Sequence, residues 1–240
     1  GMRDLHKKLQ PRDIEQLSAQ VALYRPGPLE SGMLDDFVEC RHGRQEAHYP
    51  HPCLEDILKE TFGVIVYQEQ VMQIAQKYSG YTLGGADMLR RAMGKRKPEE
   101  MAKQAGIFVE GAKKTQNVPE EESKALFNLI EKFAGYGFNK AHSLAYAFIS
   151  YQTAYLKTHY REEFMAASMT LDRGNPDKLI ILKEDLDFGK VPLLAPCINH
   201  STARFETEVH EGVKKVRFAL NAIKGSGDEA AKIITANRKE

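Results

Sequence analysis

The sequence of 240 residues has no tryptophan, three cysteines and a formal net charge of only +1. Three cysteines without a disulfide spacing are typical of a reducing compartment, so we expect a cytoplasmic protein. No apolar run approaches the length that spans a membrane, and the start shows no signal-peptide pattern, so we expect no membrane partner. Because the net charge is small, any affinity for nucleic acid must come from local basic patches.

Enough apolar sequence is present to form a core. Hydrophobic residues make up 42% of the chain, and the length suits one large domain or one domain plus a fragment. Gly1 before Met2 is typical of a tag remnant, and the chain ends at residue 240 in the middle of a sequence pattern. We therefore interpret the sequence as a piece of a longer protein.

A basic segment, YTLGGADMLRRAMGKRKP, occupies residues 81–98. Thr82 is a good N-cap and Pro98 ends the pattern, which predicts a helix over about residues 83–93. Such a density of cations needs an anionic partner or open water, and the alternative is an ordinary Asp87–Arg91 pair on a solvated helix face. The cations of this segment are Arg90, Arg91, Lys95, Arg96 and Lys97.

A second segment, GYGFNKAHSLAYA, occupies residues 135–147. Its two glycines allow a tight approach turn, and Asn139 is a good N-cap. Lys140 and His142 then stand in the first helical turn, where a bound phosphate would face both the cation and the backbone N–H groups. The alternative is an ordinary glycine-rich helix entry. The helix that follows, to about residue 160, is apolar nearly all round, which is typical of a central helix in a bundle.

Both segments, with two further strings, resemble the fingers region of the C-family bacterial replicative DNA polymerases, the DNA polymerase III alpha subunits. The similarity runs from near the start of the chain to its last residues. The strings that carry it are RPGPLESGM (25–33), YQEQVMQIA (67–75), SGYTLGGADMLRRAMGK (79–95) and EKFAGYGFNK (131–140).

The resemblance implies DNA-directed DNA synthesis by a longer parent protein. In the family, the carboxylates that hold the catalytic Mg²⁺ ions belong to a palm domain upstream of the matched region. We therefore expect no catalytic residue and no bound metal here, and we expect this fragment alone to be inactive. The implied partners are primer–template DNA, a dNTP, the palm and other domains of the polymerase, and replisome subunits.

The resemblance also implies roles for the basic residues. Arg90, Arg91, Lys140 and His142 would bind the triphosphate of the incoming nucleotide. Lys95, Arg96 and Lys97 would extend the positive surface toward DNA. Near the C-terminus, residues 220–238 resemble one helix-hairpin-helix, in which Lys224, Gly225 and Gly227 would contact a DNA phosphate.

The pattern predicts a mainly α-helical fold with a small β part. Residues 2–188 read as a helical fingers domain, and residues 189–240 as a β-hairpin followed by a truncated helix-hairpin-helix. The hairpin strands are expected over residues 204–210 and 212–219, on either side of a Glu-Gly turn. In the last helix we expect Ala230, Ile233 and Ile234 to face inward.

Other functions stay open at this point. The chain could be a non-catalytic helical DNA-binding module, an interaction scaffold, or the fingers of an error-prone alpha-like polymerase. A zinc site is a further alternative, although its spacing matches no standard structural set and scattered surface histidines are the expectation. Its ligand types would come from Cys40, His42, His48, His51 and Cys53.

Overall fold

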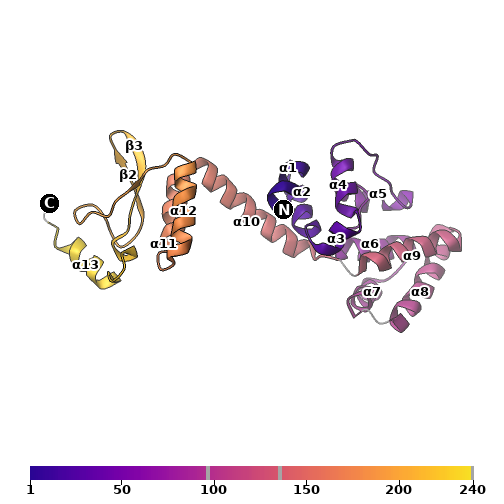
Figure 1. The fold of residues 1–240 in the computed structure, drawn as a ribbon. Coiled ribbons are helices and arrows are strands. Elements are labelled where there is room, and N and C mark those ends of the chain that lie inside the picture. The colour runs from indigo at the N-terminus through magenta and orange to yellow at the C-terminus, as the bar shows by residue number, and fades with distance from the viewer. Residues whose placement is uncertain (96–97, 135–136, 239–240) are drawn as a thin grey trace. The chain divides into compact units, whose positions relative to one another are not determined.

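The computed structural model describes residues 1–95, 98–134 and 137–238, and it confirms a mainly α-helical fold with a small sheet. Figure 1 shows the course of the chain. The first helices are α1 (Met2–Leu9), α2 (Ile14–Leu23), α3 (Pro26–Glu30), α4 (Met33–Arg41), α5 (Glu55–Leu58), α6 (Gln68–Ser79), α7 (Leu83–Lys95), α8 (Pro98–Gln116) and α9 (Glu120–Ala134). They are followed by α10 (Lys140–His159), α11 (Arg161–Leu171), α12 (Pro176–Phe188), β1 (Leu193–Leu194), β2 (Glu206–His210), β3 (Val213–Arg217) and α13 (Asp228–Ala236).

The chain divides into two compact units, residues 1–150 and 151–240. The domain boundary that composition predicts near residue 188 stays a prediction.

In the first unit, α6 is the helix against which α7 and α8 pack, and α9 packs on α8. Tyr78 of α6 stacks on Phe108 of α8 with ring centroids 5.6 Å apart, and both side chains are fully buried. A second buried cluster joins α1, α2 and α4 around Phe37. Burial of these and the other apolar side chains of the two clusters is the main favourable contribution to the folding of this unit.

Helix α10 does not fit the expectation of a central bundle helix. Ser143 and Ala147 are buried, but Tyr146 and Tyr151 are more than half exposed. Its first turns are fixed to the first unit, where the Ser143 hydroxyl donates a hydrogen bond to the backbone oxygen of Ser18. The prediction of burial was wrong because apolar residues all round a helix do not show which of them have a partner.

In the second unit, α11 and α12 share one core with the sheet. The strand order is β1–β3–β2, with β2 and β3 antiparallel as the predicted hairpin and β1 added in parallel. Glu211 and Gly212 form the turn with positive φ angles of 56° and 76°, which is the backbone that a tight hairpin needs.

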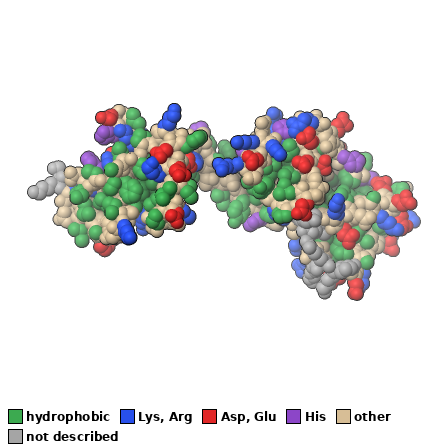
Figure 2. All heavy atoms as spheres, in the orientation of Figure 1, with side chains coloured by type: hydrophobic (Ala, Val, Ile, Leu, Met, Phe, Trp, Pro, Cys, Tyr) green, Lys and Arg blue, Asp and Glu red, His purple; other side chains and the backbone are tan. Residues whose placement is uncertain are grey.

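Hydrophobic side chains are also exposed on the second unit, as Figure 2 shows. Large exposed hydrophobic residues in this unit include Leu171, Ile180, Ile181, Phe188 and Ile198. Among the described residues, no helix combines the length and the apolar character needed to cross a membrane.

Candidate functional site

The two arginines of the first basic segment lie on α7 and share one carboxylate. Thr82 caps the helix as predicted, since its hydroxyl accepts the N–H of Gly85 at 3.1 Å. Arg90 Nη2 lies 2.7 Å from Asp87 Oδ1, and Arg91 Nε lies 2.8 Å from Asp87 Oδ2. The hydrogen bond from Arg90, helped by the charge of Arg91, lowers the pKa of Asp87. The predicted Asp87–Arg91 pair therefore exists, and the group of three side chains keeps an excess of one positive charge.

The second basic segment begins α10 as predicted. The Oδ1 atom of Asn139 accepts the N–H of His142 at 2.7 Å, which makes Asn139 the N-cap. The sequence did not predict that a carboxylate also contacts the start of α10. Glu69 of α6 accepts the backbone N–H of Lys140 at 2.9 Å and the side-chain amide of Asn139 at 2.7 Å. A carboxylate thus already occupies the N-terminal end of α10.

The ammonium group of Lys140 is also paired. Its Nζ lies 2.8 and 2.7 Å from the two carboxylate oxygens of Glu60 and 5.6 Å from the centre of the Tyr67 ring. About a third of each charged side chain is exposed. His142 contacts the rings of Phe138 and Tyr146, with centroids 5.5 and 4.8 Å away.

The start of α10 is held against α6 and α2 by a buried network. The backbone N–H of Gln68 donates to Phe138 O at 2.9 Å, and Phe138 N–H donates to Val66 O at 3.4 Å. The Tyr67 hydroxyl donates to Ser18 Oγ at 3.1 Å, and burial raises the pKa of Tyr67 to about 12. Helix α6 therefore links the two basic segments, because α7 packs on it and α10 begins at its N-terminal end.

Part of the predicted site lies outside the described residues. This holds for Arg96, Lys97 and the side chain of Lys95. On the face drawn in Figure 2, cations and acids are interspersed over the first unit, in keeping with the small net charge.

The predicted turn of the helix-hairpin-helix, which contains Lys224, Gly225 and Gly227, is present. Gly225 has a φ of +87°, a conformation that favours glycine, and Gly227 is the N-cap of α13. Lys224 is exposed. The inward face of α13 differs from the prediction, because Ala231 is fully buried whereas Ile233 is 61% exposed.

The candidate metal ligands do not converge. The Cys40 thiol points to Glu46 O at 3.7 Å, and a ring nitrogen of His42 lies 2.7 Å from Lys8 O. His51 Nδ1 accepts the backbone N–H of Cys53 at 3.2 Å. Within residues 1–95, 98–134 and 137–238, no group of three or more His, Cys, Asp or Glu side chains could hold a metal ion.

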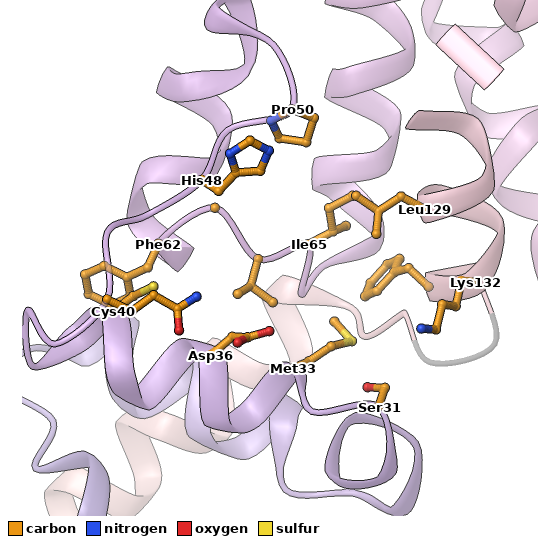
Figure 3. Close-up of a pocket in the computed structure, with 14 residues that line it drawn as sticks. Ser31, Met33, Asp36, Cys40, His48, Pro50, Phe62, Ile65, Leu129 and Lys132 are labelled. Carbon is orange, nitrogen blue, oxygen red and sulfur yellow. The ribbon is translucent and has the colours of Figure 1, made fainter. Parts of the chain in front are cut away.

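A cavity of about 310 Å³ lies in the first unit between α4, the segment before α5, and α9. Figure 3 shows its mainly apolar wall, with Asp36 and Lys132 among the polar groups that line it. Residues predicted to bind nucleotide or DNA are not among those that line it.

Comparison with known proteins places these features in a family. Residues 1–116 match the model for the bacterial DNA polymerase III alpha subunit finger domain, and residues 190–240 match the helix-hairpin-helix motif.

Similar proteins include the DNA polymerase III subunits alpha of Pseudomonas aeruginosa (54% identical), Caulobacter vibrioides (54%) and Escherichia coli (51%). Each alignment covers the whole chain but only 20 or 21% of the relative, so the chain spans about a fifth of the length of these proteins. The chain belongs to the family of bacterial DNA polymerase III alpha subunits, in the region from the finger domain to the helix-hairpin-helix motif.

Proposed function

We propose that this chain is the fingers region of a DNA-directed DNA polymerase and that it binds the triphosphate of the incoming dNTP. The observation that carries the proposal is the identity of 51 to 54% with polymerase alpha subunits over the whole chain, in which both basic segments lie. The triphosphate would be bound by Arg90, Arg91, Lys140 and His142.

Arginine suits this task because its planar guanidinium binds phosphate oxygens through two parallel hydrogen bonds. Arg91 is 67% exposed and pairs with Asp87, an (i, i+4) contact of the kind that costs little to exchange. Arg90 and Arg91 would offset the negative charge that grows on the pyrophosphate leaving group.

DNA synthesis by the complete enzyme would require Mg²⁺ ions held by carboxylates. The described residues contain no cluster of carboxylates that fits such ions. We propose that the ligands belong to another part of the longer protein, and that this fragment contributes the binding of nucleotide and DNA.

DNA would be contacted at two places. Lys95, Arg96 and Lys97 follow the triphosphate-binding arginines along the chain. In the second unit, the hairpin of Lys224, Gly225 and Gly227 would present the backbone N–H groups at the start of α13 to a phosphate.

The test is nucleotide binding by variants of the chain. Arg91→Ala is expected to raise the Kd for dATP in the presence of Mg²⁺ about tenfold, because charge-assisted hydrogen bonds to phosphate are lost. Arg44→Ala is the matched control, since Arg44 is an exposed arginine paired with one carboxylate, Glu39. In the complete polymerase, Arg91→Ala should raise KM for dNTP and lower kcat. Equal affinities of Arg91→Ala and Arg44→Ala would contradict the assignment.

A second candidate function is nucleic-acid binding without nucleotide binding. The hairpin at Gly225 favours it, because this hairpin lies in the second unit, whereas the residues proposed to bind the triphosphate lie in the first unit. DNA affinity that falls steeply with salt, while dATP has no effect on it, would support this function instead of the first.

A further inference from the structure

The Glu60–Lys140 ion pair joins residues that are 80 positions apart. Both carboxylate oxygens of Glu60 lie within 2.8 Å of Lys140 Nζ. This ammonium group is one of the cations expected to bind the triphosphate. In the absence of nucleotide its charge is therefore already satisfied by a carboxylate.

Glu60 is held in place by the buried structure around it. It lies in a short 3₁₀ helix, Lys59–Thr61, whose last residue is buried. The Thr61 hydroxyl lies 2.8 Å from the Gln70 side-chain amide of α6, and Gln70 is itself only 1% exposed. The same Gln70 side chain accepts the backbone N–H groups of Val66 and Tyr67 through its oxygen. The acid that pairs with Lys140 thus stands on the same buried scaffold as the lysine.

From this arrangement we propose that Glu60 is a positioning residue that sets the affinity for the triphosphate. It holds the Lys140 side chain over the Tyr67 ring when no nucleotide is bound, and it competes with phosphate oxygens for the ammonium group. Nucleotide binding then exchanges one anionic partner of Lys140 for another. This inference rests on the proposed function, because it requires Lys140 to contact the triphosphate.

Glu69 has a different role in the same place. Its carboxylate accepts the backbone N–H of Lys140 and the side-chain amide of Asn139. These two hydrogen bonds cap α10 and leave the Lys140 ammonium group to Glu60. Glu60 is the acid whose removal frees a cation, and it is the one to substitute.

The experiment measures the Kd of the chain for dATP with Mg²⁺ by calorimetry. Glu60→Gln is expected to tighten binding about two- to fivefold, the range for a partly exposed ion pair. Lys140→Gln is expected to weaken it. If Glu60 acts through Lys140, the double variant Glu60→Gln/Lys140→Gln has the same Kd as Lys140→Gln alone, which a purely structural role would not produce. Glu60→Asp keeps the negative charge and should return the Kd toward the native value.

Asp56→Asn is the matched control, because it frees Lys77 from a similar ion pair on the same unit. It should leave the Kd unchanged. If Lys140→Gln weakens binding but Glu60→Gln does not tighten it, the inference on Glu60 is wrong and the proposed function stands. If Lys140→Gln has no effect, or the native chain does not bind dATP, the role of Lys140 is wrong and the inference on Glu60 is wrong with it.

Discussion

Tyr67 is the residue that joins three parts of the candidate site. Its hydroxyl bonds to Ser18 of α2, its ring lies under Lys140, and its backbone pairs with Phe138 before α10. Removing the hydroxyl leaves the Ser18 oxygen buried without this donor. We expect Tyr67→Phe to lower the free energy of unfolding at neutral pH by about 1 kcal/mol, as measured by urea denaturation. An unchanged midpoint would show that the bond contributes nothing.

The same residue predicts how stability depends on alkaline pH. Burial raises the pKa of Tyr67 to about 12 in the folded chain, above the value of about 10 for an exposed phenol. The unfolded chain therefore loses this proton first, so the stabilising contribution is complete below pH 10 and is lost as the pH rises toward 12. Tyr67→Phe should flatten the fall of the unfolding free energy between pH 10 and 12. An identical fall in the native chain and the variant would contradict the raised pKa.

Residue roles set by local contacts could be predicted, and those set by distant contacts could not. Thr82 and Asn139 cap their helices as the sequence indicates, because a cap is decided within four residues. Glu60 and Glu69 lie 80 and 71 positions from Lys140, and no spacing connects them to it. The two acids beside Lys140 could therefore not be predicted from the sequence, whereas the Asp87–Arg91 pair, four residues apart, could.

At the scale of elements, α8 offers a matched pair of glycines. A Cβ atom at Gly111 would overlap the backbone carbonyl oxygen of Ser79 at the end of α6, whereas one at Gly106 would meet open space. Gly111→Ala should separate two packed helices and lower the free energy of unfolding by about 1 to 3 kcal/mol. Gly106→Ala should raise it by about 0.5 to 1 kcal/mol, because alanine favours the helix more than glycine does. Thermal denaturation of both variants tests this, and equal shifts would contradict the close approach of α6 and α8.

The elements themselves were largely predictable, with exceptions that have physical causes. Prolines with acids beside them are a start signal for helices, and Pro98, Pro119 and Pro176 stand at or just before the starts of α8, α9 and α12. The Glu-Gly turn likewise predicts the β-hairpin. Strand β1 has only two residues, Leu193 and Leu194, and it becomes a strand only by pairing with β3. The exposure of α10 could not be read from its apolar sequence, because its surroundings are decided by tertiary structure.

At the scale of the whole molecule, the buried clusters of the two units share no residue. The clusters around Tyr78 and Phe37 belong to residues 1–150, and the cluster around Leu186 belongs to residues 151–240. Truncating a buried side chain leaves a cavity, and contacts are lost only by the residues that line this cavity. We predict that each unit has its own stability, so the changes in unfolding free energy expected for the Tyr67, Gly106 and Gly111 variants refer to the first unit.

Leu186→Ala and Ile74→Ala test this independence, since both side chains are fully buried, in the second and first unit respectively. Each truncation should cost about 2 to 5 kcal/mol in its own unit. In native-state hydrogen exchange, Leu186→Ala should speed the exchange of amides in α11, β2 and β3 and leave those in α6 and α8 unchanged, while Ile74→Ala should do the reverse. If either variant speeds exchange in both units alike, the chain unfolds as one cooperative body. The proposed nucleotide binding to the first unit would then also stabilise the second unit.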